Sequence, residues 1–161
     1  MTVRQKIRTC LWFDHEAEDA AKLYTSLFPD SRILDIAHYG EAGPGKPGSV
    51  LMVTFELSGA QFLALNGGPH FKLSEAVSLS VDCVDQAEVD ALWDKLGAGG
   101  AYSRCGWLKD RYGLSWQIVP SRLPELIGGA DKAGAKRAME AMLKMSKLDI
   151  AELEAAYAGV A

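Results

Sequence analysis

The sequence has no apolar run of the roughly 18 residues that a membrane-spanning helix needs. Its N-terminal stretch, residues 1–16, carries charges too early and too often for a secretory signal peptide. Neither sign of charge dominates, and the lysines and arginines are scattered rather than gathered into a basic stripe. These absences predict a cytoplasmic protein that binds neither nucleic acid nor a membrane.

Cysteine is scarce, with only Cys10, Cys83 and Cys105. Their spacing fits no zinc motif, and an odd number argues against a disulfide framework. We therefore expect small core residues here rather than nucleophiles. The three histidines, His15, His38 and His70, lie on separate segments, and nothing in the sequence groups them.

The 161 residues are 48% hydrophobic and 24% charged, which is typical of a globular protein and sufficient for one domain or two small halves. A strand, a helix and further strands follow one another twice. Asp14 is the expected cap of the first helix. The expected turn before the last strand is "RYG", and the charges of Lys109, Asp110 and Arg111 are expected to lie in solvent. The first copy is predicted as a strand at 6–13, a helix at 15–28 and strands at 31–40, 50–57 and 60–66; the second as strands at 75–83, 99–110 and 113–120 around a helix at 85–97.

The C-terminal tail, residues 121–161, differs from both copies because it is helical throughout. An apolar stripe of alanine, methionine and leucine runs along "DKAGAKRAMEAMLKM", and Asp149 with Glu152 forms a capping box for a last helix that ends at Gly159. Such a stripe is more typical of packing or an interface than of a ligand site.

Five motifs carry a resemblance to a known family: "CLWFD", "FPDSRI", "ALNGGP", "RCGWLKDRYGLSWQIVP" and "AMEAMLKMSKLDIAELE". The chain resembles, from about residue 6 to 158, the PhnB-like branch of the vicinal oxygen chelate superfamily, which includes glyoxalase I and the bleomycin-resistance proteins. The resemblance implies an α+β fold of two βαβββ modules, 1–68 and 74–120, in a single domain over 1–161. It implies a curled mixed sheet around a shared cavity, followed by the tail.

In metal-dependent relatives the first and last strands of each module supply the ligands. The resemblance places these positions on Thr9, Phe62, Ser78 and Gln117. Gln117 stands where active metalloenzymes of the superfamily keep a glutamate. A divalent transition metal prefers imidazole, thiolate or carboxylate, so we expect neither a metal nor another cofactor.

The remaining cavity predicts a small-molecule site. Strand alternation puts Thr9, Leu11 and Phe13 on one face and Ser115, Gln117 and Val119 on another, and it turns Trp12 and Trp116 toward the helices. The residues expected to line the cavity are Thr9, Leu11, Phe13, Tyr39, Phe62, Asn66, Ser78, Trp107 and Gln117. For Asn66 a turn before Gly67 is the competing interpretation.

Three functions stay open. The first is binding of an unidentified small molecule without a metal. The second is a metal-independent enzyme that uses Asp14, Asn66, Cys105 or Gln117. The third is methyl transfer, because many relatives are named 3-demethylubiquinone-9 3-methyltransferase. The usual methyltransferase needs a glycine-rich turn that leads from a strand into a helix, and none of the glycine runs here does so.

A homodimer is the expected assembly. The two tail helices have apolar faces at Met139, Met142, Leu143 and Met145 and at Ile150, Leu153 and Tyr157. A second copy would cover such faces. The alternative is that the tail folds back over its own sheet.

Overall fold

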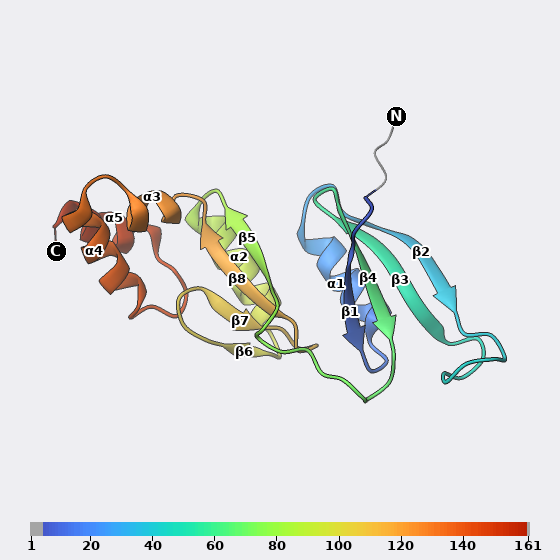
Figure 1. Cartoon of the computed structure of the whole chain (residues 1–161). Coiled ribbons are helices and arrows are strands. Elements are labelled where there is room, and N and C mark those ends of the chain that lie inside the picture. Colours follow the sequence, from blue (N-terminus) through green and yellow to red (C-terminus); the bar gives the residue numbers. More distant parts are fainter. Residues whose placement is uncertain (1–4, 161) are drawn as a thin grey trace. The chain divides into compact units, whose positions relative to one another are not determined.

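The computed structural model describes residues 5–160. The chain divides into two compact units, residues 1–73 and 74–161 (Figure 1). Each unit repeats one order of elements, a strand, a helix and three strands, as the sequence predicts. The assembly of both units into a single domain stays a prediction.

In the first unit β1 lies beside β4 in parallel, and β4, β3 and β2 follow in antiparallel order. The helix α1 covers one face of this sheet, and its Ala17, Ala20 and Ala21 are fully buried, which brings the helix close to the strands. The elements are β1 Thr9–Phe13, α1 Ala17–Leu27, β2 Arg32–His38, β3 Val50–Leu57 and β4 Ala60–Asn66.

The second unit has the same strand order, with β5 parallel to β8 and then β7 and β6. The predicted strand at 99–110 is two short strands, because Cys105 and Gly106 both take positive φ (56° and 81°) and form a turn between them. The elements are β5 Ser78–Cys83, α2 Gln86–Gly97, β6 Ala101–Tyr102, β7 Trp107–Lys109 and β8 Ser115–Pro120.

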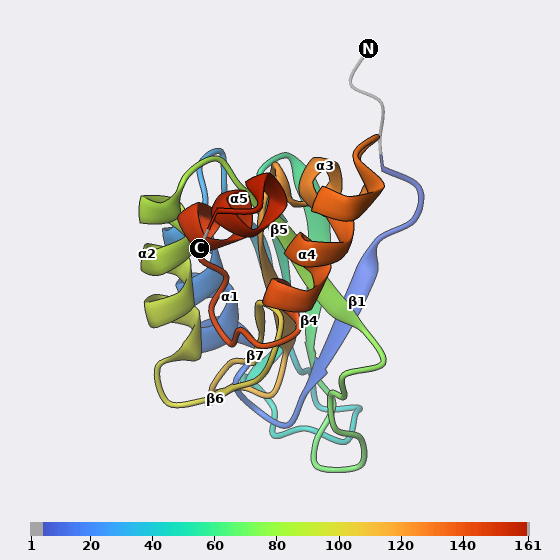
Figure 2. The ribbon, with the colours of Figure 1, turned by 90° about the vertical axis from the view of Figure 1, so that its left-hand side faces the viewer.

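Three helices of the tail follow: α3 Leu123–Gly128, α4 Lys132–Met142 and α5 Ile150–Ala158 (Figure 2). They pack on one another around a small apolar cluster of Leu123, Leu126, Ala138, Met145, Leu148 and Leu153. Asp149 caps α5 by accepting from the backbone N–H of Glu152, and Gly159 ends it in the left-handed region, as predicted. Among the described residues, no helix is long and apolar enough to cross a membrane.

The tail corrects the reason given for a dimer. The expected contact was with a partner or with the sheet, but the helices bury most of their apolar side chains against each other: Leu148 and Leu153 are completely buried and Met145 is 8% exposed. Leu143 and Val160 remain exposed, at 54% and 62%, so the tail keeps only part of its apolar surface for a second copy.

Candidate functional site

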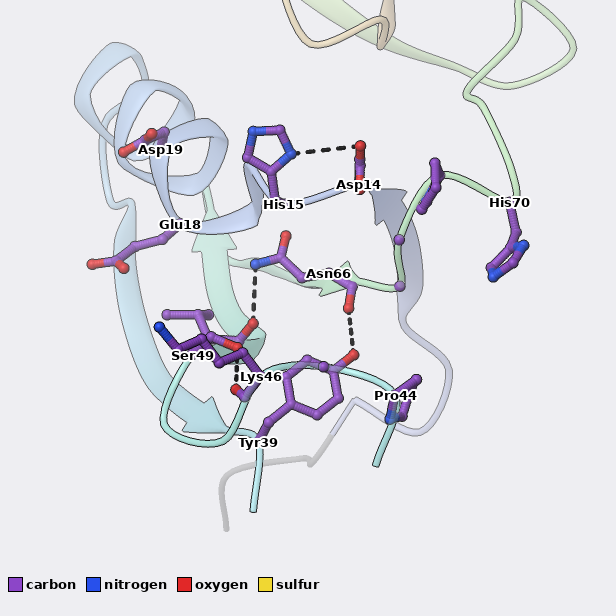
Figure 3. Close-up of a pocket in the computed structure, with 15 residues that line it drawn as sticks. Asp14, His15, Glu18, Asp19, Tyr39, Pro44, Lys46, Ser49, Asn66 and His70 are labelled. Atoms are coloured by element: carbon purple, nitrogen blue, oxygen red, sulfur yellow. Dashed lines mark hydrogen bonds and ion pairs between the residues drawn. The ribbon is translucent and has the colours of Figure 1, made fainter. Parts of the chain in front are cut away.

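A pocket of about 450 Å³ opens in the first unit where α1 begins. It brings together two of the predicted cavity residues, Tyr39 and Asn66, from the ends of β2 and β4 (Figure 3). We call it the α1 pocket; its lining is Asp14, His15, Glu18, Asp19, Tyr39, Pro44, Gly45, Lys46, Ser49, Val50, Asn66, Gly67, Gly68, Pro69 and His70.

Asn66 forms the centre of this pocket and is only 8% exposed. Its side-chain oxygen accepts from the backbone N–H of Ala17 at 2.8 Å, and its amide nitrogen donates to the carbonyl of Val50 at 3.1 Å. Its own carbonyl accepts from the Tyr39 hydroxyl at 2.6 Å. Asn66 thus holds a helix, a strand and a loop, and its hydrogen-bonding groups are occupied by the protein itself.

Asn66 also replaces Asp14 as the cap of α1, so the predicted cap is wrong. The N-cap position belongs to Glu16, whose side chain makes no capping hydrogen bond. Asp14 instead lies 3.6 Å from His15, and both side chains are largely exposed. An acceptor distant in sequence satisfies the helix, which a local motif search does not detect.

The charged lining of the α1 pocket is mostly acidic, with Asp14, Glu18 and Asp19. No sequence pattern groups the histidines, yet His15 and His70 both line this pocket. Within residues 5–160, however, no three histidine, cysteine or acidic side chains lie close enough to hold a metal ion. The α1 pocket thus has exposed charged side chains around Asn66, whose side chain is already hydrogen-bonded within the protein.

The second unit presents a polar sheet face opposite α2. The helix packs on the face that carries Trp116 and Ile118, which are both buried, as the alternation of β8 predicts. The other face holds three serines and a glutamine on the two parallel strands β5 and β8. We call this the serine–glutamine patch; its residues are Ser78, Ser80, Ser115 and Gln117.

One hydrogen bond links the two strands within the patch: the Gln117 amide donates to the Ser78 hydroxyl at 2.9 Å. Ser115, which pairs with Ser78 in the sheet register, is 1% exposed. Its hydroxyl has no hydrogen-bond partner among the described residues. A buried hydroxyl without a partner costs about 1–3 kcal/mol, so Ser115 is an unsatisfied polar group at the edge of the patch.

An indole ring and an ion pair border the patch. Trp107 pairs with Gln117 across β7 and β8 and is half-buried, so three predicted residues, Ser78, Trp107 and Gln117, lie together. On the same face Lys109 pairs with Ser115 in register and binds Glu75 at 2.6 Å. This hydrogen bond holds the pKa of Glu75 below its ordinary value. The sequence reasoning missed the Lys109–Glu75 pair and the orphan hydroxyl, because neither follows from a motif.

Asp110 positions the hairpin that leads into β8. The sequence suggests a solvated turn charge, but Asp110 is 3% exposed. One carboxylate oxygen accepts from the backbone N–H groups of Tyr112 and Leu114, and the other accepts from the Trp116 indole at 2.9 Å. This carboxylate therefore fixes the start of the strand that carries Ser115 and Gln117.

The other predicted cavity residues lie on the α1 side of the first sheet. Leu11 and Phe13 are core residues, 2% and 3% exposed, and the Phe62 ring stacks on the buried Phe55 at 5.5 Å. Thr9 pairs with Phe62 in register, which puts it on the same face, where it is exposed. The prediction that Trp12 faces the helix is therefore wrong, since the adjacent Leu11 and Phe13 do.

Trp12 lies on the uncovered face of the first sheet. Its indole donates to the Gly68 carbonyl at 2.9 Å, and its ring meets Phe71 edge-on at 4.9 Å. Met52 and Leu65 are half-buried on the same face. The two units thus differ in the face that their helix leaves open: apolar in the first and polar in the second.

The four positions that the resemblance assigns to metal ligands do not fit a transition metal. Ser78 and Gln117 offer a neutral hydroxyl and a neutral amide that already bind each other, and Phe62 offers no donor atom. Thr9 adds one exposed hydroxyl. A set without carboxylate, imidazole or thiolate is weak for divalent transition metals.

The model of the 3-demethylubiquinone-9 3-methyltransferase family matches residues 5–119. The chain belongs to this family. A putative 3-demethylubiquinone-9 3-methyltransferase, PhnB protein, from Bacillus cereus is 41% identical; the alignment covers 70% of this chain and 97% of that one, with a TM-score of 0.65. The fold is therefore that of the PhnB-like proteins.

A more distant solved structure has the same fold. Protein PA1353 from Pseudomonas aeruginosa has a TM-score of 0.59 at 17% identity, over 70% of this chain and 94% of that one. A protein from Staphylococcus aureus is 35% identical over 70% of this chain and 93% of that one, with a TM-score of 0.33. No curated protein matches the chain significantly. The family match ends at residue 119, so the resemblance expected for the tail, to residue 158, lies outside it.

Proposed function

We propose that this PhnB-like protein binds a small organic molecule on the serine–glutamine patch without a catalytic metal. The observation that carries the proposal is the buried Ser115 hydroxyl, which lacks a partner in the described chain and lies beside the Gln117–Ser78 hydrogen bond. Ligand sites combine an apolar or aromatic wall with a few convergent polar groups. Trp107 supplies that wall in register with Gln117.

The chemistry of the patch favours a neutral ligand. Hydroxyl and amide groups donate and accept hydrogen bonds without adding charge. The adjacent Lys109 is compensated by Glu75. A flat ring that carries hydroxyl or carbonyl oxygens therefore fits best, because the ring stacks on Trp107 while its oxygens reach Ser115 and Gln117.

Native mass spectrometry of the protein purified from cell extract tests this proposal. We expect a small bound mass that is released on collisional activation. Gln117→Leu should lower its occupancy about tenfold, because a lost hydrogen bond at a buried site costs on the order of 1–2 kcal/mol. Tyr39→Phe, in the α1 pocket, is the matched control and should retain the bound mass.

The opposite pattern, with loss in Tyr39→Phe and retention in Gln117→Leu, would move the ligand to the α1 pocket and refute the proposal. Titration with S-adenosylmethionine tests the methyl-transfer alternative in the same samples. Saturable binding that Gln117→Leu abolishes would favour methyl transfer over plain binding.

We propose a homodimer for the same protein, on a different surface from the one expected at first. The apolar face of the first sheet, which carries Trp12, Met52 and Leu65, has more apolar surface for a second copy to bury than the tail has.

A cytoplasmic location accords with the free state of Cys10, Cys83 and Cys105, since reducing compartments keep thiols unpaired.

A further inference from the structure

The tail lies outside the part of the chain that the family model matches. The family model ends at residue 119, and the Bacillus cereus protein is covered over 97% of its length by 70% of this chain. The three tail helices pack mainly on one another around their own apolar cluster. Most of the hydrogen bonds and ion pairs that join the tail to the rest of the second unit, among the described residues, run through residues 142–150, which we call the strap; the Ser121 N–H also donates to the Cys83 carbonyl at 2.8 Å.

One side of the strap binds the turn between β6 and β7. The backbone N–H groups of Cys105 and Gly106 donate to the carbonyls of Met145 and Ser146, at 2.9 and 2.8 Å. The Ser146 hydroxyl donates to the Ser103 carbonyl at 2.6 Å. Since a Cβ on Gly106 would lie 2.7 Å from the Ile118 carbonyl oxygen, the strap and β8 enclose this turn tightly.

The other side of the strap binds α2 through the side chain of Gln86. Its amide nitrogen donates to the Leu148 carbonyl at 3.1 Å, and its oxygen accepts from the Ile150 N–H at 2.9 Å. A neighbouring ion pair joins Lys147 to Asp90 at 2.8 Å. Gln86 thus bonds to the strap backbone as a neighbouring strand would.

The turn that the strap holds leads directly into the proposed ligand site. Trp107 follows Gly106, and the Trp107 carbonyl accepts from the Ser103 N–H at 2.9 Å. The Gly106 carbonyl accepts from the N–H of Ile118, the residue after Gln117, at 2.7 Å. The strap is therefore two hydrogen bonds away from both the aromatic wall and the patch.

We propose that the tail is a brace for the ligand site, with Gln86 as the positioning residue that ties the strap in place. The site it serves is the one proposed above, so the ligand part of this inference rests on that function. Gln86 touches no ligand itself; it acts on Trp107 through the strap and the turn.

The test uses the full chain labelled with 5-fluorotryptophan, which gives one ¹⁹F signal for each of its 4 tryptophans. Trp107→Phe identifies the Trp107 signal. Gln86→Leu and Ser146→Ala release the strap from opposite sides, and Lys95→Ala on the same helix is the control. Both release variants should shift or broaden the Trp107 signal and leave that of Trp12 unchanged, while Lys95→Ala should leave both unchanged.

Hydrogen exchange gives a second readout that does not depend on a ligand. The amides of Cys105 and Gly106 should exchange about tenfold faster or more in both release variants, because their acceptors are strap carbonyls. Gln86→Glu retains the acceptor for Ile150 and should fall between the wild type and Gln86→Leu. An unchanged Trp107 signal and unchanged exchange in both release variants would overturn the brace.

The bound mass then separates the two proposals. A brace that serves the site predicts several-fold lower occupancy in Gln86→Leu at unchanged mass. If the wild type carries no bound mass but Trp107 still responds, the proposed function fails and the brace stands. If Trp107 responds and the occupancy stays at the wild-type level, the brace does not serve this site and the inference is wrong.

Discussion

Asp110 illustrates how a single buried carboxylate sets a hairpin. Its three hydrogen bonds reach two backbone N–H groups and one indole, so truncation leaves three donors without an acceptor. We expect Asp110→Ala to lower the free energy of unfolding by about 3 kcal/mol, because hydrogen bonds to a charged group contribute on the order of 1.5–3 kcal/mol each and solvent relieves part of the loss. Urea unfolding measures the change.

Asp110→Asn should cost less than Asp110→Ala. The amide oxygen still accepts from the turn, but its nitrogen meets the Trp116 N–H as a second donor. The exposed Asp94→Ala on α2 is the control and should change stability little. Equal effects of the three substitutions would mean that the carboxylate does not organise the hairpin.

Cys83 gives the second unit a dependence on alkaline pH. Burial, with Glu88 and Asp82 nearby, raises the pKa of its thiol from 9.0 to about 12. The unfolded chain loses this proton first, so it binds fewer protons than the folded chain between these two values, and stability falls as the pH rises through that window. At pH 10.5 the loss is about 2 kcal/mol.

Urea unfolding of wild type and Cys83→Ala at pH 8 and pH 10.5 isolates this effect, because every other group cancels between the two proteins. We expect the stability of the wild type to fall more than that of Cys83→Ala over this interval. The same burial should protect Cys83 from iodoacetamide at pH 8 while the exposed Cys10 reacts. Parallel pH profiles of the two proteins would contradict the assignment.

At the scale of the element, Asn66 decides where α1 begins. Asn66→Ala removes the acceptor of the Ala17 N–H and the donor to Val50. We expect a loss of about 2 kcal/mol, in the range of a lost helix cap together with an unpaired buried group. Asn66→Asp keeps the acceptor for the Ala17 N–H but turns a second carboxylate oxygen toward the Val50 carbonyl, so it should also lower stability in urea unfolding while the cap remains. Amide exchange at Ala17 should accelerate in Asn66→Ala only.

Strand phase shows what the sequence can and cannot specify. In β8 polar Ser115 and Gln117 alternate with Trp116 and Ile118, so the face toward the helix is predictable. In β1 the run "TCLWF" is apolar on both sides, and no alternation distinguishes Leu11 and Phe13 from Trp12. For this reason the prediction that Trp116 faces the helix was confirmed, and the same prediction for Trp12 was wrong.

The same distinction applies to the site. The order of elements follows from local patterns, whereas Ser78 and Gln117 were placed by the family resemblance; they lie on the neighbouring strands β5 and β8, two register positions apart. The Gln86 bonds to the strap and the orphan Ser115 hydroxyl depend on contacts between segments distant in the chain, for which neither periodicity nor spacing gives a signal. Cap prediction at Asp14 failed because the acceptor comes from β4.

At the scale of the whole molecule, we expect a homodimer that forms through the apolar face of the first sheet. Sedimentation of the intact chain at micromolar concentration should give a dimer. Leu65→Lys places a charge on the apolar face next to Trp12 and should give a folded monomer, because an unpaired charge opposes burial of that face. Leu143→Lys, on the exposed part of the tail, is the matched control and should remain a dimer.

Circular dichroism distinguishes a folded Leu65→Lys monomer from an unfolded one. A monomeric wild type would refute the dimer, and a monomer from Leu143→Lys alone would return the interface to the tail.

In both units the first strand pairs only with the last strand of that unit. Thr9 therefore cannot pair until Phe62 has been synthesised, and Ser78 cannot pair until Ser115 has been synthesised. On the ribosome the first sheet therefore stays open until β4 has left the exit tunnel, and it then closes while the second half is still being translated. The second unit follows later, since Gln86 needs Ile150. Force profiles of arrested nascent chains should accordingly show two separate pulling events, the later one after Ile150 has left the exit tunnel.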